Sequence, residues 1–437
     1  MGRIMHLVFL ILLALQVVFG RYEYAHYCKL RGCCPGRQDD CLYQIDRHTV
    51  CYCDEFCVKT KTYVNSIDCC SDYWSSCRRS EPWVYGNNTC YVKDLNREYK
   101  VNGEFKINCN KCKCHVGNRN MNISCDEEVC VVDDKLISLV NSRNLGWTAS
   151  KQNEFWGLTI REGFAKLLGT FYFSQKVLRM SSIHVRVRSL PHSFDAREEW
   201  PGYIQGPKNQ GHCGASWAFS TISVASDRWA IESKGNFTNG LSYRQLFLCS
   251  KSQRQCNGGH ITKAWRFLKK YGLLPEMCLP WDWNEVHNEK VCHKKTAKAA
   301  HCPAIGSFEP IRRMGPAYRI EGEKQIMQEI MTNGPVQATM TVYREFFLYK
   351  EGVYNCANID STNLEGFHSV KLIGWGESIY EEKYWLAVNS WGTSWGEGGY
   401  FRITRGQQAC RIETFVIGAH TIQSTSKKLP FDVTRRR

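Results

Sequence analysis

Residues 210–217 read QGHCGASW and place Ser216 at the head of an apolar run. The spacing of the apolar residues after it predicts a helix over 216–232. The stretch therefore predicts that a helix begins at Ser216. His368 and Asn389 follow far downstream.

This pattern resembles the papain family, and within it cathepsin B. The family signature is C-G-[SA]-C-[WY] with His and Asn far downstream, and residues 213–217 match it except that Ser216 replaces the second cysteine. The resemblance implies that His368 is the general base, that Asn389 orients it and that Gln210 is the oxyanion-hole side chain. It also implies an α+β fold of two lobes, a helical left lobe and a β-barrel-like right lobe, preceded by small disulfide-rich modules.

The serine changes the chemistry that the cleft can perform. A cysteine at a helix N-terminus beside an imidazolium becomes a thiolate, because both neighbours lower its pKa from about 8.5 toward 3–4. A hydroxyl titrates far higher, so Ser216 could act only if His368 removed its proton during attack. The cleft is shaped around a larger sulfur, and we expect the oxygen to lie too far from this base. We therefore expect no catalytic residue, no cofactor and no metal, with the polar groups satisfying one another.

Two further departures from cathepsin B concern specificity. Its occluding loop carries adjacent histidines that grip a substrate carboxylate, whereas the corresponding stretch here, residues 292–302, has His293 and His301 apart. Phe415, five residues past Cys410, stands where cathepsin B has an acidic group at the base of its S2 pocket. The resemblance implies that exopeptidase activity and Arg-directed specificity are both lost.

The chain of 437 residues exceeds one compact core and predicts roughly two to four domains. Residues 1–20 have the form of a secretory signal, with a basic residue, an apolar core and a small-residue cleavage site. That apolar run is too short to span a bilayer comfortably, and no later stretch could cross a membrane. We therefore expect a chain secreted to the extracellular space or matrix.

The 24 cysteines predict disulfides in such a compartment, and their even number predicts twelve bridges with no thiol left over. Three N-x-[ST] sequons, at Asn87, Asn122 and Asn236, predict glycosylation. The formal net charge is +15, with dispersed basic clusters at 312–313 and in the tail. These clusters indicate either a solvated surface or attraction to extracellular polyanions such as heparan sulfate, and no nucleic-acid partner is expected.

Cysteine spacing separates two small modules from the rest of the chain. Residues 21–80 contain few aliphatic side chains and must be held together by disulfides. Their pattern resembles the somatomedin B module, and their cysteines are Cys28, Cys33, Cys34, Cys41, Cys51, Cys53, Cys57, Cys69, Cys70 and Cys77. Residues 81–130 resemble part of a von Willebrand factor type C module. Metal binding is the alternative for such clusters, and an extracellular compartment argues against it.

Residues 131–189 contain neither cysteine nor proline. Apolar residues at helical spacing predict one helix around 160–168 and another beginning near 136. The segment resembles the cathepsin B pro-segment, which implies that 168–171 lie across the active-site cleft. An active enzyme must clear its cleft and a scaffold need not, so we expect the segment to stay docked, with three shielded aromatic side chains. These are Trp156, Phe164 and Phe171.

Residues 190–420 resemble the mature cathepsin B domain, and residues 421–437 form a polar, basic tail. The resemblance implies the disulfide Cys213–Cys256 and favours Cys249–Cys302. For the remaining cysteines of the domain we expect Cys278–Cys292 and Cys356–Cys410.

The order of these parts is similar to that of the tubulointerstitial nephritis antigen family. The resemblance implies a secreted, catalytically inactive papain-family homologue that acts as an adhesion or binding scaffold in extracellular matrix or basement membrane, with matrix proteins as partners. Two alternatives stay open. The chain could be a residual papain-fold peptidase or hydrolase, or a decoy that binds peptides or protease inhibitors in its cleft.

Overall fold

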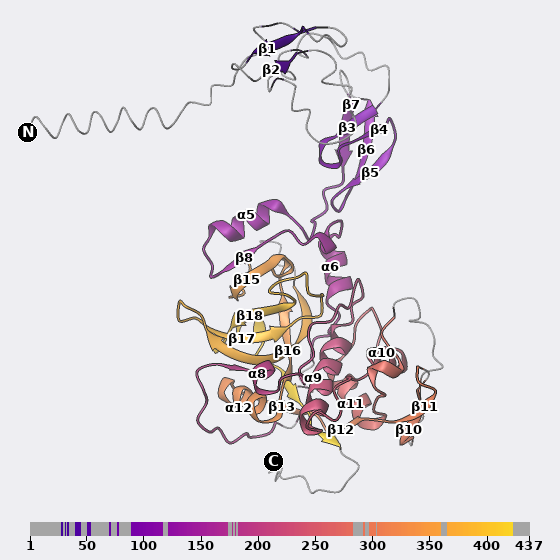
Figure 1. Cartoon of the computed structure of the whole chain (residues 1–437), viewed down its shortest axis with the longest axis vertical. Helices are drawn as coiled ribbons and strands as arrows, with labels where there is room; N and C mark the ends of the chain where they lie inside the picture. The colour runs from indigo at the N-terminus through magenta and orange to yellow at the C-terminus, as the bar shows by residue number, and fades with distance from the viewer. Residues whose placement is uncertain are drawn as a thin grey trace, which may run out of the picture. The chain divides into compact units, whose positions relative to one another are not determined.

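The computed structural model describes residues 28, 31, 33–34, 40–44, 50–53, 70, 77, 89–116, 121–173, 177, 180, 182–282, 292, 297–302, 304–359 and 365–422. The expected signal peptide (1–20), most of the tail and three other expected sites, Cys57, Cys69 and Asn87, lie outside them. The chain divides into two compact units, residues 1–89 and 90–437. Figure 1 draws both units, and each is described by itself.

The first unit is organised around disulfides. Strands β1 (Leu42–Gln44) and β2 (Val50–Tyr52) form an antiparallel pair. The buried cluster of the described residues is made of cystine sulfur packed with Tyr43. Its bridges are Cys28–Cys53, Cys33–Cys77, Cys34–Cys41 and Cys51–Cys70. An aliphatic core is replaced by covalent links, as a small module with few aliphatic side chains requires.

The second unit begins with a small β module. Two strands, β3 (Thr89–Val92) and β4 (Arg97–Lys100), pair beside a three-stranded sheet. That sheet contains β5 (Glu104–Ile107), β6 (Asn110–Val116) and β7 (Met121–Cys125). The bridges of the module are Cys90–Cys114, Cys109–Cys130 and Cys112–Cys125. The assignments of 21–80 and 81–130 to named module families stay predictions.

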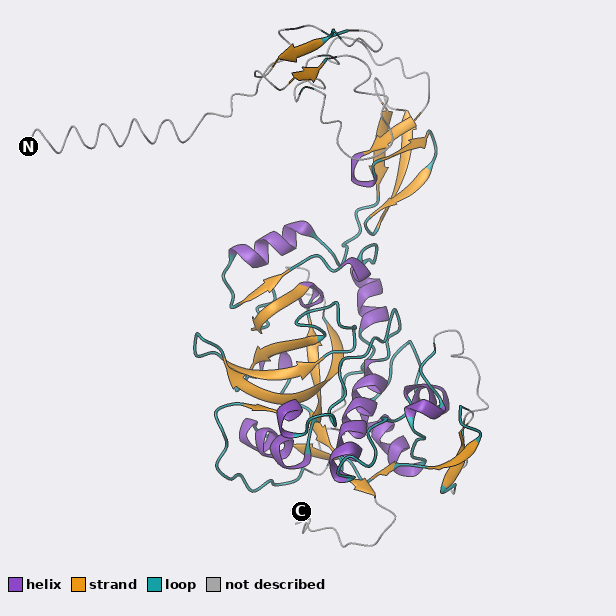
Figure 2. Cartoon of the chain, viewed as in Figure 1, coloured by secondary structure: helices purple, strands orange, loops and turns teal. Residues whose placement is uncertain are grey.

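The right lobe is built on one long sheet with the strand order β13-β19-β14-β16-β17-β18-β15-β8, and β9 pairs with β16 beside this path. Trp391 and Trp395 lie in its aromatic core. Figure 2 shows these strands on one side of the unit and most helices on the other. The strands are β8 (Trp147–Ala149), β9 (Phe194–Asp195), β13 (Tyr318–Ile320), β14 (Val336–Val342), β15 (Tyr349–Tyr354), β16 (Gly366–Glu377), β17 (Lys383–Val388), β18 (Tyr400–Thr404) and β19 (Val416–Gly418).

The left lobe is helical. Helix α9 (Ser216–Glu232) is buried from Ser216 to Ala230, and its bounds confirm the predicted helix. Figure 1 shows α9 between the sheet and the two helices α10 (Tyr243–Cys249) and α11 (Ile261–Lys270). The smaller elements around the lobes are α8 (Ala196–Glu199), η3 (Glu276–Cys278), β10 (Ala299–Cys302), β11 (Ser307–Pro310), β12 (Arg313–Met314), α12 (Glu323–Asn333), η5 (Arg344–Leu348), η6 (Ala409–Arg411) and β20 (Thr421–Ile422).

Residues 131–168 pack on the right lobe. Helix α5 (Asp134–Ser142) is capped by Asp133, and α6 (Ile160–Leu167) begins with a capping box of Thr159 and Glu162, which fixes where each helix starts. Between them β8 joins the edge of the long sheet, antiparallel to β15, and η2 (Asn153–Phe155) follows. Both predicted helices are confirmed.

One expectation about the aromatic residues of this segment is wrong. Trp156 is 40% exposed, because its ring lies outside the core cluster and contacts the ammonium group of Lys151, 3.7 Å from the ring centroid. Phe164 and Phe171 are half-buried. Phe155, next to Trp156, is the buried ring, in edge contact with Trp391.

Two expected disulfides are also wrong. Cys249 pairs with Cys292 and Cys278 with Cys302, whereas the expected pairs were Cys249–Cys302 and Cys278–Cys292. The reason is a small apolar cluster in which Cys278 and Cys302 are buried together with Leu274. The expected bridges Cys213–Cys256 and Cys356–Cys410 are present. No described cysteine is free.

Within the described ranges, no helix is both long enough and apolar enough to cross a bilayer. The sulfurs of Cys28, Cys53 and Cys70 lie within 4.8 Å of one another. All three sulfurs are already in disulfides, so they are not free to ligate a metal.

Candidate cleft

Ser216 is the first residue of α9 and is fully buried. Its backbone N–H donates to the carbonyl oxygen of Leu168, at 3.1 Å. Its hydroxyl lies 2.8 Å from the hydroxyl of Thr170. Both partners belong to segment 131–189, so this segment reaches the residue around which the cleft was predicted.

His368 and Asn389 come from neighbouring strands. His368 lies in β16, Asn389 follows the end of β17, and both are buried. His368 Nε2 and Asn389 Oδ1 are 2.8 Å apart, and the same oxygen accepts the backbone N–H of Ser390. An amide oxygen accepts and does not donate, so the imidazole carries its proton on Nε2. In the described part of the chain, Nδ1 of His368 has no hydrogen-bond partner.

Burial also sets the charge of this imidazole. Desolvation lowers the pKa of His368 to about 4, against a smaller opposing effect of the hydrogen bond to Asn389. The ring is therefore neutral at pH 7, with a free lone pair on Nδ1. The imidazolium that would stabilise a thiolate or an alkoxide is absent from this resting arrangement.

Gln210 completes the predicted set. Its amide Nε2 donates to the carbonyl oxygens of Leu167 (2.9 Å), Leu168 (3.3 Å) and Cys213 (2.7 Å). Its Oε1 accepts the hydroxyl of Ser390 at 2.5 Å. The Leu168 carbonyl thus receives the two donors, the Ser216 N–H and Gln210 Nε2, that an oxyanion hole directs at a reacting carbonyl.

Residues 167–173, here called the cleft-spanning segment, run between the two lobes. The Gly259 N–H donates to Gly169 O (2.9 Å), and the Phe171 N–H donates back to Gly259 O (2.8 Å). On the other side the Thr170 N–H donates to Phe367 O (3.3 Å). Gly169 has φ +100°, and a Cβ there would lie 2.0 Å from the Gly214 carbonyl oxygen, so only glycine can pass so close to the start of α9.

Aromatic rings of the cleft-spanning segment pack against residues of both lobes. Phe173 is buried, and its ring centroid lies 4.7 Å from that of Phe415. The Phe171 ring meets His260 edge-on at 5.1 Å, and the Tyr172 ring lies 4.5 Å from Phe367. Phe415, which was expected at the base of a specificity pocket, is therefore covered by a side chain of the same molecule.

The comparisons agree with this architecture. The profile of papain family cysteine proteases matches residues 190–420. The chain belongs to the papain family. It is 40% identical over 419 residues to the human protein named tubulointerstitial nephritis antigen-like, an alignment that covers 90% of this chain and 87% of the relative. It is also 40% identical over 420 residues to bovine tubulointerstitial nephritis antigen, covering 90% and 86%.

Solved structures give the same result for the fold. The structure of procathepsin B S9 from Trypanosoma congolense superposes with a TM-score of 0.57 at 28% identity, over 67% of this chain and 99% of the other. Procathepsin L 3 from the larval midgut of Tenebrio molitor shares the fold, with a TM-score of 0.52 at 22% identity, over 65% and 87%.

A chain of hydroxyl groups, absent from the sequence prediction, lies beneath Ser216 in this papain-family cleft. Gln337 Nε2 donates to Ser220 Oγ at 2.6 Å, and Ser220 Oγ donates to the Ser216 carbonyl oxygen, also at 2.6 Å. Ser220 Oγ and Thr170 Oγ1 each lie 2.8 Å from Ser369 Oγ. These short polar side chains lie far apart in the sequence, and no sequence pattern marks them.

The hydroxyl chain holds the Ser216 hydroxyl away from the base. Ser220 Oγ and Ser369 Oγ can both donate to the Ser216 carbonyl oxygen, at 2.6 and 3.1 Å, and either hydroxyl of the Ser216–Thr170 pair can be the donor. Among the described residues Nδ1 of His368 has no hydrogen-bond partner, so the Ser216 hydroxyl is bonded to Thr170 and not to His368.

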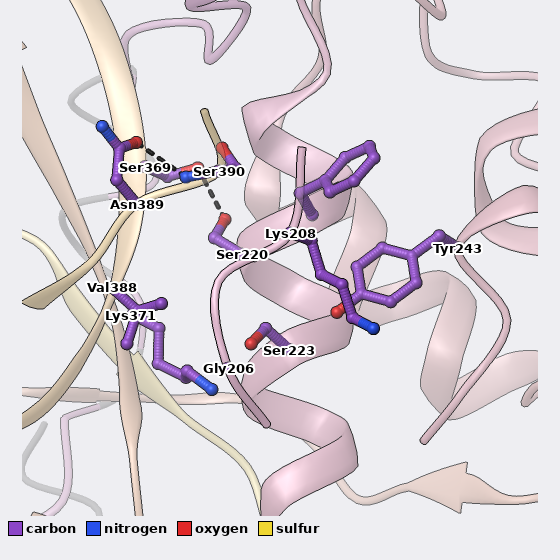
Figure 3. A pocket seen from close by; sticks show the side chains of 11 residues that line it. Gly206, Lys208, Ser220, Ser223, Tyr243, Ser369, Lys371, Val388, Asn389 and Ser390 are labelled. Carbon is purple, nitrogen blue, oxygen red and sulfur yellow. Dashed lines mark hydrogen bonds between the residues drawn. The ribbon is translucent and has the colours of Figure 1, made fainter. Parts of the chain in front are cut away.

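A small cavity borders the same chain. It is lined by Ser220, Ser369 and Asn389 together with Tyr243 and Lys371, as Figure 3 shows. Lys371 Nζ forms a buried ion pair with Asp227 Oδ2 at 2.5 Å. Burial lowers the pKa of this Lys371 and raises that of Asp227, and their mutual attraction opposes both shifts.

The other predicted sites lie apart from the cleft. His301 is exposed on β10, with its ring 5.8 Å from that of Phe308, and His293 lies outside the described residues. Asn122, on β7, and Asn236 are both exposed. Exposure is what attachment of a glycan requires, and glycosylation stays a prediction.

Proposed function

We propose that this papain-family chain is a secreted homologue without peptidase activity and acts as a binding scaffold in extracellular matrix or basement membrane. The observation that carries the proposal is the state of Ser216. It stands where the family signature has the catalytic cysteine, and its hydroxyl is hydrogen-bonded to Thr170 of the chain's own cleft-spanning segment.

Three features of the cleft support the absence of peptidase activity. The Ser216 side chain has no thiol, and its hydroxyl is hydrogen-bonded to Thr170 and not to His368. The oxyanion-hole donors are occupied by Leu168 O at 3.1 and 3.3 Å. A substrate carbonyl cannot enter until the cleft-spanning segment leaves.

Displacement of the segment is costly. Leu167, Leu168 and Phe173 are each at least 94% buried. Exposing three such side chains costs about 5–9 kcal/mol, at roughly 1.5–3 kcal/mol each. The indole N–H of Trp391 also donates to Leu167 O at 2.7 Å. The cleft is held closed by the same kinds of contact that hold the core.

The upstream end of segment 131–189 is anchored as well. Arg344 donates to the Cys130 carbonyl oxygen through Nε (2.9 Å) and Nη2 (2.6 Å), and Nη2 also reaches Asp133 Oδ2 (2.9 Å). Asn108 bonds Val132 O (2.7 Å) and the Gly157 N–H (3.1 Å). An enzyme that matures by releasing its pro-segment has no use for this attachment to a disulfide-linked module, whereas a scaffold gains a larger rigid body from it.

The matrix role is supported by kinship and composition. The chain aligns along nine-tenths of its length with tubulointerstitial nephritis antigens. Eleven disulfides link its described cysteines, an arrangement suited to an oxidising, extracellular compartment. The somatomedin B-like and type C-like modules and the glycosylated surface belong to the same proposal.

A residual hydrolase is the second candidate, and one observation favours it. A neutral imidazole with a free Nδ1 lone pair is the form that a general base requires. A decoy that captures peptides gains no such support, because Leu168 O already accepts from the donors at Ser216 and Gln210.

The deciding experiment measures turnover of fluorogenic peptides and labelling by epoxide probes. The purified chain is compared with Ser216→Ala, His368→Ala and Ser216→Cys. The natural chain and Ser216→Ala should both remain at the level of the blank. Turnover that is abolished in both alanine variants would establish the hydrolase instead. Binding to decellularised basement membrane tests the scaffold half, and it should be the same for the natural chain and Ser216→Ala.

A further inference from the structure

The left lobe contains a long stretch of one charge sign. Residues 233–275 contain no aspartate or glutamate and eight basic residues. These are Lys234, Arg244, Lys251, Arg254, Lys263, Arg266, Lys269 and Lys270. The stretch includes helices α10 and α11. A charge run of this kind concentrates a positive potential over one part of the lobe.

Helix α11 presents four of these charges on one face. With 3.6 residues per turn, Lys263, Arg266, Lys269 and Lys270 fall within an arc of about 120°, along a length of about 10 Å. Arg266, Lys269 and Lys270 are exposed and Lys263 is half-buried. The opposite face of the helix is buried in the left-lobe core and consists of Ile261, Ala264, Trp265, Phe267 and Leu268. We call the four cations the α11 basic face.

The charges of this face are not neutralised locally. None of the four forms an ion pair with another described residue; Lys263 Nζ donates to Ser252 O at 3.1 Å, and Lys270 lies 5.0 Å from the Tyr271 ring centroid. The positive potential of these cations extends to the helix N-terminus, where burial, Lys263 and Arg254 together lower the pKa of His260. The positive end of the helix dipole adds to it.

We propose that the α11 basic face is a binding site for a sulfated linear polysaccharide. The proposal rests on the extracellular location given under Proposed function. Sulfate groups along an extended chain match a row of cations about 10 Å long, and the Arg266 guanidinium can bind a sulfate through two parallel N–H groups. The site extends toward Arg254, whose guanidinium carbon lies 5.6 Å from the Phe171 ring.

The structure favours a polysaccharide over a membrane surface. A helix that lies in a bilayer interface needs an apolar face for the lipid. The apolar face of α11 is already packed in the core, and none of the exposed large apolar side chains of the described residues lies on this helix. The α11 basic face therefore presents cationic groups to solvent and no large apolar side chain, which suits the binding of a strongly hydrated polyanion.

The test is heparin affinity of the full secreted chain, measured against salt concentration. One variant carries Lys263→Gln, Arg266→Gln, Lys269→Gln and Lys270→Gln. The matched control removes the same charges from exposed positions elsewhere, through Arg161→Gln, Lys324→Gln, Lys350→Gln and Lys383→Gln. The first variant should bind about thirtyfold more weakly, since each lost ion pair weakens binding roughly twofold to threefold. Its salt dependence should also be shallower.

Each of the following outcomes would contradict the proposed binding site. An equal loss in the control assigns binding to overall net charge. Loss of binding after truncation at Ala419, with the α11 variant unaffected, assigns it to the tail. Phosphatidylserine vesicles or duplex DNA that bind in preference to heparin identify another class of polyanion. All arms are run in the Ser216→Ala background as well, so a chain that turns out to be a peptidase disproves the proposed function and leaves this measurement intact.

Discussion

The hydroxyl of Ser216 is joined to the hydroxyl of Thr170 across 2.8 Å, and Thr170 is in turn 2.8 Å from Ser369. A serine at the nucleophile position thus serves as a hydrogen-bond partner that holds the cleft-spanning segment against α9. A thiol is a weak donor and a weak acceptor, so this hydrogen bond depends on the same oxygen that makes the site unfit for cysteine chemistry.

The contribution of the Ser216–Thr170 hydrogen bond to stability can be measured by removing either hydroxyl. Ser216→Ala should lower the free energy of unfolding by about 1 kcal/mol, the usual contribution of one hydrogen bond, and Thr170→Val, which removes the contacts with both Ser216 and Ser369, should lower it by about 2 kcal/mol. Amide exchange at residues 168–171 should quicken in both. The two effects should be less than additive in the double variant, because each single variant already breaks the Ser216–Thr170 bond. Ser223→Ala, on the same helix but outside the hydroxyl chain, is the control, and additive effects would separate Ser216 from Thr170.

His368 should make the fold sensitive to acid. Its folded pKa is about 4, below the ordinary value of 6.5. A group with a depressed folded pKa contributes stability that is present above pH 6.5 and lost as the pH falls through 4, and the difference amounts to about 3 kcal/mol. His368→Asn should therefore lose less stability than the natural chain between pH 7 and pH 4 in urea unfolding. Exposed His301→Asn should behave like the natural chain, and identical pH profiles for all three would contradict the assignment.

Glu276 should make the fold less stable as the pH rises, whereas His368 makes it less stable as the pH falls. Burial raises its pKa from 4.5 to about 7, although the backbone N–H groups of Tyr243 and Trp281 donate to the carboxylate. Because the folded pKa lies above the ordinary value, the contribution of Glu276 to the free energy of unfolding is fully present below pH 4.5. At most about 3 kcal/mol of it is lost as the pH rises through 7. Glu276→Gln should remove most of this decline between pH 5 and pH 8. An exposed carboxylate, Glu381, is the control in Glu381→Gln, and a decline that persists in Glu276→Gln would contradict the account.

The disulfide pairing of the left lobe can be checked directly. Peptide mapping without reduction should recover Cys249 linked to Cys292 and Cys278 linked to Cys302. Recovery of Cys249 with Cys302 would restore the pairing expected from sequence. Alkylation before reduction should label none of the described cysteines.

The sequence was informative where a local pattern determines the structure. The apolar spacing after Ser216 predicted α9 to its last residue, Glu232. Gln210, His368 and Asn389 could be assigned by motif. The pairing of Cys249 and Cys278 could not be predicted, because it depends on which two cysteines are buried together in the cluster around Leu274.

Size and hydrophobicity alone also failed to predict exposure. Trp156 and Phe155 are adjacent, and the smaller ring is the buried one. The hydroxyl chain shows the same limit, because Thr170, Ser216 and Ser369 meet only after the two lobes and the cleft-spanning segment have assembled. Serine and threonine are common residues, so their positions in the sequence do not predict such a contact.

The attachment of the disulfide-linked module to the right lobe should depend on the Arg344 guanidinium. Arg344→Lys keeps the charge and removes the fork that holds Cys130 O and Asp133. We expect a loss of about 2 kcal/mol in unfolding free energy, typical of charge-assisted bonds, and faster cleavage by trypsin within 131–150. Arg402→Lys, which breaks the Arg402–Glu397 pair inside the right lobe, should leave that cleavage rate unchanged. Equal cleavage in both variants would mean that Arg344 stabilises the lobe in general and does not anchor the segment.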